Sequence, residues 1–241
     1  MKVLVALDFD GTLAPFCLDP ADSAMVPQAR HALADLARAG VDLALVSGRG
    51  LSDLAERAQA PDGVILVGSH GAEWGRLRDG GLELLPSDTT GEGEEEVLAA
   101  IVRHFEALAR DGAWVERKPT GVVLHTRTMT DRAAGRTLRD AAGVVARARG
   151  ARVLDGDEAL EAVLGQATKG QAVARLREMT GADIVLYAGD DVTDESALSA
   201  ADLGIKVGDG ASVAAIRVAG AREMGQLLEV FAALARAASA A

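Results

Sequence analysis

The chain has 241 residues, 49% of them apolar, which is enough to form the core of one large or two small domains and excludes extensive disorder. Its 36 acidic residues outnumber its 25 lysines and arginines, and the formal net charge of -11 disfavours binding to nucleic acid or anionic lipid. The single cysteine, Cys17, rules out an internal disulfide and fits a reducing cytosol.

The apolar runs are short. The run at residues 3–7 falls below the roughly 7 to 15 apolar residues of a signal-peptide core. No run approaches the ~18 apolar residues of a membrane span. We therefore expect a cytoplasmic protein that does not bind membrane. We also expect a monomer that does not bind nucleic acid.

Four segments resemble strands that are buried on both faces. They are near-continuously apolar, and stretches rich in Ala, Leu and Arg with helical spacing separate them. This pattern is typical of parallel strands with crossover helices, and it predicts a doubly wound, Rossmann-like α/β core. The segments are "VLVAL" (3–7), "VDLALV" (41–46), "GVILVG" (63–68) and "DIVLYAG" (183–189).

The first predicted helix covers residues 27–39. Pro27 suits its first turn, Ala29, Leu33 and Leu36 form an apolar stripe, and Gly40 follows its end. A stripe of this kind predicts a helix that packs with one face on the sheet.

The middle of the chain follows a different pattern. A helix with an acidic first turn is predicted at 92–112, and two alternating strands follow at 113–119 and 121–128. A second helix (130–150) and a second hairpin (151–156 and 158–165) repeat the order. Residues 86–164 are thus predicted to be an α+β domain of order α-β-β-α-β-β, inserted into a core formed by residues 1–85 and 165–241. A helix at 169–180 and a strand at 183–188 resume the core pattern.

Carboxylates and a hydroxyl follow three of the predicted core strands. Asp8 and Asp10 follow the first strand, Ser47 follows the second, and "GDDVTDE" (189–195) follows the strand at 183–188. Ligands in open α/β sheets bind at the carboxyl ends of the strands, so these groups should share one crevice. Clustered carboxylates repel one another unless a cation binds them, and a hard divalent ion prefers oxygen ligands, so we expect Mg²⁺.

Lys169 stands at the start of a predicted helix, where backbone N–H groups and the helix dipole also favour an anion. A metal, a lysine, a serine and a helix N-terminus together would form a phosphoryl site, which we therefore expect here. A carboxylate nucleophile would divide hydrolysis into two steps through an aspartyl-phosphate.

The segments "DFDGTLAP", "SGR", Lys169 with Gly170, and "GDDVTDE" resemble, in this order, the four motifs of the haloacid dehalogenase superfamily of phosphatases. The segments "VGSHGAEW", "VERKPTGVVLHTR" and "GDDVTDE" further resemble trehalose-6-phosphate phosphatases, from residue 1 to about residue 210. The inserted unit matches the cap of that family.

The resemblance implies roles for individual residues. Asp8 would be the nucleophile and Asp10 the general acid and then base, with Ser47 and Lys169 binding phosphate. Mg²⁺ would lie on the Asp8 carboxylate, the Asp10 backbone carbonyl and Asp190, with Asp191 or Asp194 in support. The implied substrate-binding residues are Arg49, His70, Glu73, Glu116, Lys118, His125, Arg127 and Glu161.

Alternation along the cap strands places Glu116 and Lys118 on one face, and His125 and Arg127 on another. If these faces meet over the crevice, they offer charged and hydrogen-bonding groups to the hydroxyls of a sugar.

The expected activity is Mg²⁺-dependent hydrolysis of a sugar phosphate, with trehalose 6-phosphate as the favoured substrate. Alternatives are a phosphatase for sucrose phosphate or a mannosyl-glycerate phosphate, a phosphomutase, and a catalytically dead sugar-phosphate sensor. The second acid, Asp10, favours a phosphatase or mutase because a leaving alkoxide needs a proton. The intact set of Asp8, Asp10, Lys169 and Asp190 disfavours the sensor.

Overall fold

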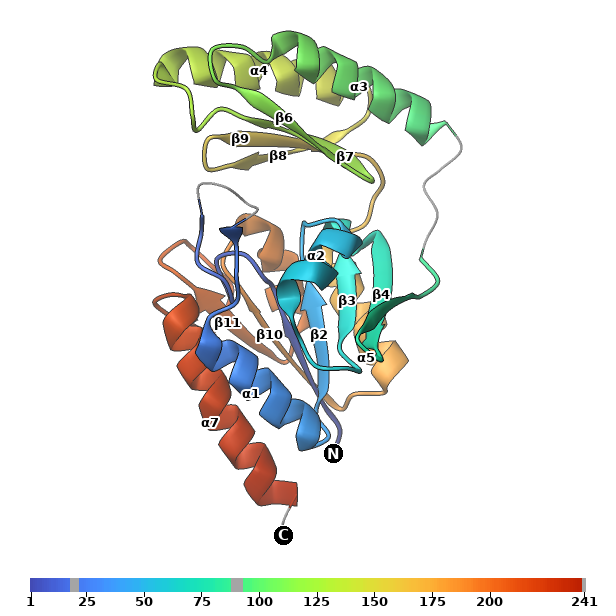
Figure 1. Cartoon of the computed structure of the whole chain (residues 1–241), viewed down its shortest axis with the longest axis vertical. Coiled ribbons are helices and arrows are strands. Elements are labelled where there is room, and N and C mark those ends of the chain that lie inside the picture. Colours follow the sequence, from blue (N-terminus) through green and yellow to red (C-terminus); the bar gives the residue numbers. More distant parts are fainter. Residues whose placement is uncertain (18–21, 88–92, 240–241) are drawn as a thin grey trace. The chain divides into compact units, whose positions relative to one another are not determined.

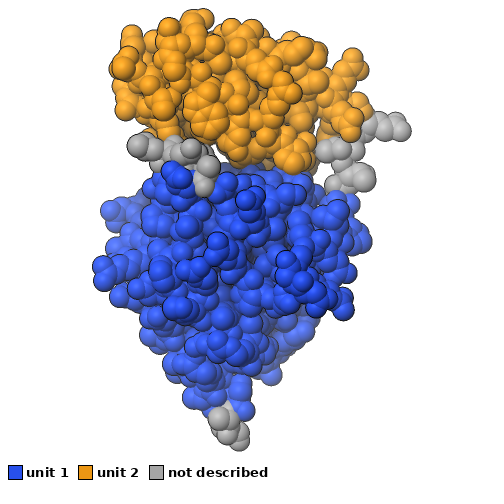
Figure 2. All heavy atoms as spheres, in the orientation of Figure 1, with its two compact units in different colours: residues 1–87, 167–241 blue, residues 88–166 orange. Residues whose placement is uncertain are grey.

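The computed structural model describes residues 1–17, 22–87 and 93–239. The chain divides into two compact units, one of residues 1–87 and 167–241 and the other of residues 88–166 (Figure 2). No helix within the described ranges is both long enough and apolar enough to cross a membrane.

Unit 1 contains one sheet of eight strands in the order β12-β11-β10-β1-β2-β3-β4-β5 (Figure 1). The six strands from β12 to β3 run parallel, and β4 and β5 extend the sheet antiparallel. The strands are β1 (Val3–Leu7), β2 (Asp42–Val46), β3 (Ile65–Gly68), β4 (Glu73–Arg78), β5 (Gly81–Leu84), β10 (Ile184–Gly189), β11 (Leu203–Val207) and β12 (Ile216–Val218).

Helices cover both faces of this sheet, as the doubly wound prediction requires. Apolar residues of α1, α2 and α7 share one core cluster with strand residues, and those of α5 and α6 share the cluster on the other face. The predicted stripe of α1 is confirmed, since Ala29, Leu33 and Leu36 are all buried. The helices are α1 (Pro27–Arg38), α2 (Leu51–Ala58), α5 (Lys169–Thr180), α6 (Glu195–Ala200) and α7 (Ala221–Ser239), with short 3₁₀ turns η2 (Ser69–Gly71) and η3 (Val192–Asp194).

The β4–β5 hairpin was not among the predicted elements. Its two-residue turn has positive φ at Asp79 (51°) and Gly80 (73°), which is the conformation of the tight turn that matches the twist of a hairpin. The hairpin adds an antiparallel edge to a sheet that the apolar runs alone predicted to be parallel.

Unit 2 contains a four-stranded antiparallel sheet in the order β6-β7-β9-β8, with both of its helices packed on one face. Its elements are α3 (Glu94–Leu108), β6 (Trp114–Lys118), β7 (Gly121–His125), α4 (Arg132–Ala148), β8 (Arg152–Gly156) and β9 (Ala159–Val163). The order α-β-β-α-β-β agrees with the predicted order. The expected start of the first helix, at residue 92, lies outside the described residues.

The start of α5 is fixed by a capping box. The Thr168 hydroxyl accepts a hydrogen bond from the Gln171 backbone N–H (3.2 Å), and the Gln171 side-chain oxygen accepts one from the Thr168 backbone N–H (3.1 Å). The box defines Lys169 as the first residue of α5. It therefore fixes the position of the Lys169 backbone, from which the side chain extends.

We expect Thr168→Ala to destabilise unit 1 by about 1 kcal/mol, because the cap accepts an otherwise unpaired helix N–H, whereas Thr168→Ser should keep most of the stability. Trp74 and Trp114 are the two tryptophans and lie in different units. Urea unfolding followed by Trp74 fluorescence in a Trp114→Phe background measures the effect on unit 1. Equal midpoints for the Ala and Ser variants would contradict the prediction.

Candidate active site

The sheet order brings the predicted catalytic residues to one edge. Strand β1 lies between β10 and β2, and all three run parallel. Asp8, Ser47 and Asp190 directly follow these three strands, so residues far apart in sequence meet at the carboxyl ends of neighbouring strands.

Lys169 connects two of the carboxylates. Its ammonium Nζ donates to Asp8 Oδ1 (2.6 Å) and to Asp194 Oδ1 (2.7 Å), and all three side chains are at most 5% exposed. Burial alone would lower the pKa of Lys169, but the carboxylates of Asp194 and Asp8 outweigh burial and raise it. The lysine therefore stays charged and fixes the rotation of the Asp8 carboxylate.

Asp194 accepts four hydrogen bonds. Its Oδ1 takes the Lys169 ammonium and the hydroxyl of Tyr187 (2.6 Å), while its Oδ2 takes the backbone N–H groups of Asp190 (3.1 Å) and Asp191 (3.0 Å). Burial opposes ionisation of Asp194, but Lys169 and these donors lower its pKa below the ordinary value. Asp194 thus anchors both the lysine and the loop that carries Asp190.

Gly11 allows the loop after β1 to approach Asp190. A Cβ at this position would lie 2.1 Å from Asp190 Oδ2, and its φ of +77° is one that glycine adopts without strain. The neighbouring Thr12 hydroxyl donates to Asp190 Oδ1 at 3.3 Å. The "DGT" turn therefore helps to hold the Asp190 carboxylate beside β1.

The carboxylates of Asp8, Asp190 and Asp194 form a carboxylate cluster, and together they carry more negative charge than Lys169 neutralises. Burial is the main cause that raises the pKa of Asp8 well above its usual value, and repulsion by Asp194 and Asp190 adds to it. Burial and repulsion by Asp194 likewise raise the pKa of Asp190 to about 6. A further cation beside Asp8 and Asp190 would relieve this repulsion.

The donor set fits a hard divalent cation. Asp8, Asp190 and Asp194 each offer a carboxylate oxygen, and these three atoms lie within 4.8 Å of one another. Oxygen-only sites with few carboxylates suit Mg²⁺. Because both oxygens of Asp194 already accept two hydrogen bonds each, Asp8 and Asp190 are the members of the cluster with oxygens available to a metal.

The Asp10 side chain has a set of partners different from those of the carboxylate cluster. Arg49 donates to both of its oxygens, from Nε (2.6 Å) and from a terminal nitrogen (2.7 Å), and the Ser23 hydroxyl donates to Asp10 Oδ1 at 2.7 Å. Arg49 also donates to Asp53 at 2.6 Å. In this structure the Arg49 guanidinium binds Asp10, and the role in substrate binding that the resemblance implies for Arg49 stays a prediction.

The remaining predicted core residues surround the start of α2. The buried Ser47 hydroxyl oxygen accepts from the Arg49 N–H at 3.1 Å. Glu73 accepts from the Ser69 hydroxyl (2.6 Å) and from the N–H of Leu51 (3.1 Å), so it anchors the beginning of α2. The buried His70 ring lies against Gly48, where a Cβ would come within 2.6 Å of it.

The predicted sugar-binding residues of unit 2 form a cluster of their own. Strand register pairs Glu116 with Val123 and Val123 with Glu161, which places Glu116, Lys118, His125 and Glu161 on one face of the sheet. The expectation that His125 lies on a different face from Glu116 is therefore wrong, because antiparallel partners face the same way. Helices α3 and α4 cover the opposite face, so this face carries the charges.

Hydrogen bonds and a ring stack hold the side chains of this charged face in place. Glu116 meets His125 Nε2 at 2.9 Å, and Lys118 donates to Glu161 at 3.1 Å. Burial opposes ionisation of Glu116, but His125 and Lys118 lower its pKa. The Trp114 ring stacks on His125 with centroids 3.9 Å apart. Arg127 lies beyond the end of β7, with a terminal nitrogen 3.4 Å from the Asp157 carbonyl.

The sequence interpretation missed Tyr187 and Ser23. Tyr187 is the chain's single tyrosine, within an otherwise aliphatic strand just before the acidic motif, and that isolation was the available signal. Ser23 carries no such signal, because only the fold brings it to Asp10.

Comparison with known proteins extends these observations. The sequence model of the trehalose-phosphatase family matches residues 6–208. A trehalose-phosphate phosphatase of Mycobacterium ulcerans is 34% identical over 213 residues, covering 81% of this chain and 50% of the relative. An uncharacterized glycosyl hydrolase of Mycobacterium tuberculosis is 34% identical over 212 residues, covering 81% of this chain and 15% of the relative. The chain therefore spans half or less of the length of these relatives.

Solved structures show the same architecture. A trehalose-6-phosphate phosphatase related protein superposes with a TM-score of 0.75 at 28% identity, covering 96% of this chain and 97% of the other. The C-terminal domain of Candida albicans trehalose-6-phosphate phosphatase superposes with a TM-score of 0.79 at 21% identity, covering 96% and 92%, which shows the shared fold. With a family match over residues 6–208 and the motif residues gathered at one sheet edge, this chain belongs to the trehalose-phosphatase family.

Proposed function

We propose that the chain is a Mg²⁺-dependent phosphatase that hydrolyses trehalose 6-phosphate to trehalose and phosphate through an aspartyl-phosphate. The observation that carries the proposal is the buried cluster in which Lys169 bridges Asp8 and Asp194 beside Asp190. A binding module would need neither a nucleophile nor a second acid. Membership of the family supports the choice of substrate.

The first step is attack by an Asp8 carboxylate oxygen on phosphorus. A P–O bond forms to Asp8 as the bond to the sugar oxygen breaks, and Asp10 gives its proton to that oxygen. Lys169 holds Asp8 in orientation, and the Ser47 hydroxyl and Lys169 would bind phosphoryl oxygens. Mg²⁺ on Asp8, Asp190 and the Asp10 carbonyl would neutralise the developing negative charge.

The second step returns the enzyme to its starting state. Asp10, now a carboxylate, takes a proton from water, and the water oxygen attacks phosphorus while the bond to Asp8 breaks. In this structure the Asp10 carboxylate accepts both Arg49 donors. We infer that Asp10 leaves Arg49 when it serves as acid, because a carboxyl group that receives the guanidinium fork holds no proton to donate.

We propose that the polar face of unit 2 binds the sugar. Glu116, Lys118, His125 and Glu161 offer both donors and acceptors, and Trp114 adds an aromatic surface that is 36% exposed. Sites that hydrogen-bond hydroxyl groups reject analogues that lack them, so such a face can select one sugar phosphate.

Asp8→Asn tests the nucleophile and the substrate together. We expect metal-dependent phosphate release to favour trehalose 6-phosphate over sucrose phosphate and mannosyl-glycerate phosphate, to stop with chelator, and to fall by at least about 10³-fold in the variant. The exposed Asp209→Asn variant is the matched control and should keep full activity. Preference for another sugar phosphate would discard trehalose 6-phosphate, and activity without Asp8 would discard the mechanism.

Asp10→Asn separates general acid catalysis from binding. For a sugar phosphate, whose alkoxide needs a proton, we expect kcat to fall about 10²- to 10⁴-fold. For 4-nitrophenyl phosphate the loss in the first step should be far smaller, because its phenolate leaves without a proton. Pre-steady-state release of nitrophenolate measures that step alone. Asp53→Asn, which removes the charge of another Arg49 partner, is the control. Equal losses on both substrates in Asp10→Asn would contradict the acid role of Asp10.

Lys118→Ala tests sugar recognition by unit 2. We expect kcat/KM for trehalose 6-phosphate to fall at least about tenfold, as for loss of a hydrogen bond to a charged group, with little change for 4-nitrophenyl phosphate. Arg117→Ala is the matched control, since Arg117 is adjacent, exposed and paired with Glu106 of α3. Equal loss on both substrates would show that Lys118 supports folding instead.

A further inference from the structure

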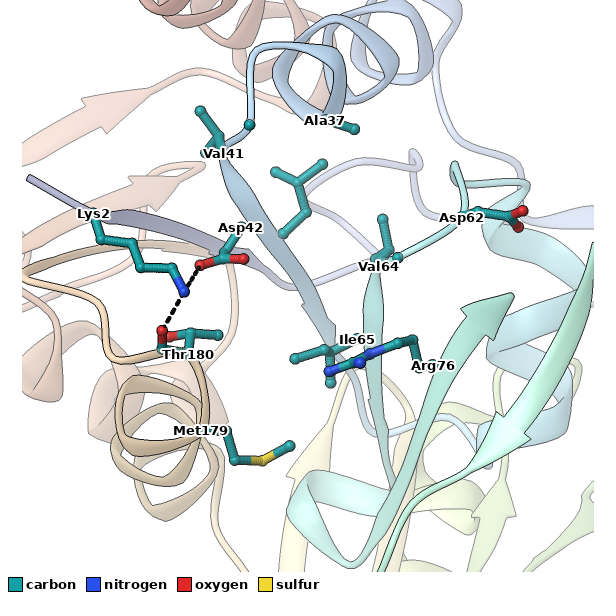
Figure 3. Close-up of a pocket in the computed structure, with 13 residues that line it drawn as sticks. Lys2, Ala37, Val41, Asp42, Asp62, Val64, Ile65, Arg76, Met179 and Thr180 are labelled. Atoms are coloured by element: carbon teal, nitrogen blue, oxygen red, sulfur yellow. Dashed lines mark hydrogen bonds and ion pairs between the residues drawn. The ribbon is translucent and has the colours of Figure 1, made fainter. Parts of the chain in front are cut away.

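A cavity of about 370 Å³ lies within unit 1 at the edge of the sheet opposite the carboxylate cluster. Residues at the amino ends of β2 and β3 line it, together with Lys2 before β1, Arg76 of β4 and the last residues of α5 (Figure 3). None of the residues assigned to phosphoryl transfer lines it. Its volume falls within the roughly 300 to 1,000 Å³ of small-molecule sites.

Arg76 places a positively charged guanidinium beside this cavity, and no carboxylate among the described residues pairs with it. Its Cα pairs with that of Ile65 on β3, and its guanidinium extends over Ile65 (Figure 3). The Arg76 Nε is buried and makes no hydrogen bond, and among the described residues the side chain has no ion-pair partner. The Arg76 side chain as a whole is half-buried, and its buried Nε–H is the donor that lacks a partner. Because a buried donor without a partner is costly and the guanidinium is positively charged, Arg76 favours an anionic acceptor in the cavity.

The other charged groups of the cavity do not supply that acceptor. Asp62 accepts from the backbone N–H groups of Asp79 (3.0 Å) and Gly80 (3.2 Å). Asp42 Oδ2 lies 3.3 Å from Lys2 Nζ, and Lys2 Nζ donates to the Thr180 carbonyl at 2.5 Å. The Asp42 Oδ2 atom is itself buried without a hydrogen bond, so it can accept from a hydroxyl.

We propose that this cavity binds a small hydroxylated anion. A carboxylate or phosphate group would accept hydrogen bonds from two N–H groups of the Arg76 guanidinium, whose fork suits both oxyanions, and a hydroxyl of the ligand would donate to Asp42. Leu43 and Ile65 form buried apolar walls against which the carbon skeleton packs. With a protein net charge of -11, an anion needs such a local cation to bind. This site is independent of the proposed function.

Chemical-shift mapping on the isotope-labelled chain tests the site without relying on turnover. Glycerate and glycerol 3-phosphate are the two probes, carrying the carboxylate and the phosphate respectively, and chelator is present to prevent hydrolysis. We expect saturable shifts at the amides of Asp42, Ile65 and Arg76 with a dissociation constant of about 1 mM or below. The amides of Ser47 and Gly170 report the opposite edge of the sheet.

Arg76→Gln should weaken binding at least about tenfold, because it replaces the charged fork with a neutral amide. Arg78→Gln is the control, since Arg78 lies on the same strand, is exposed and pairs with Glu83 at 3.6 Å. Arg76→Lys keeps the charge without the fork and should bind with intermediate strength; it also serves if the Gln variant fails to fold. Response to one probe alone would identify the oxyanion.

Absence of saturable shifts with both probes would overturn the proposal and leave a cavity filled by water. Shifts confined to Ser47 and Gly170 would also overturn it, since the anion would then occupy the phosphoryl site. Unchanged affinity in both Arg76 variants would show that the guanidinium does not anchor the ligand, which contradicts the proposal equally.

Discussion

The buried contact of Lys169 with Asp8 and Asp194 is the interaction on which the site depends. Three carboxylates within 4.8 Å cannot all stay ionised in a buried place without positive charge, and one ammonium supplies only part of it. The three carboxylates can therefore stay ionised together only when each has a positively charged or hydrogen-bonding partner. The cluster still needs positive charge because its carboxylates are buried together, and their oxygens are ligands that a hard divalent cation prefers.

The fold meets these requirements with backbone as well as side chains. The capping box of α5 sets the position of Lys169, and Gly11 leaves space for the Asp190 carboxylate beside the loop after β1. Asp194 links Lys169 to the loop that carries Asp190, because its oxygens accept hydrogen bonds from both. It also accepts one from the buried hydroxyl of Tyr187. Loss of one of the four donors to Asp194 would disturb the others, because all four share its two oxygens.

The two units carry different sets of polar residues. Unit 1 places the carboxylate cluster at the carboxyl ends of neighbouring parallel strands of its Rossmann-like sheet. Unit 2 buries one face of its antiparallel sheet under α3 and α4, which leaves the other face for Glu116, Lys118, His125 and Glu161. An antiparallel sheet with a single covered face can thus carry a polar surface that a parallel core sheet, covered on both faces, cannot.

The sequence by itself determined the fold class, the order of the inserted elements and the edge at which Asp8, Ser47 and Asp190 meet. Apolar runs mark buried parallel strands, and their carboxyl ends are then fixed by chain direction. The tertiary structure alone decided the partners: Arg49 and Ser23 on Asp10, Tyr187 on Asp194, and the shared face of Glu116 and His125. Local patterns specify which side of a strand a residue occupies, whereas strand register and loop packing decide which distant atom comes within hydrogen-bond distance of it.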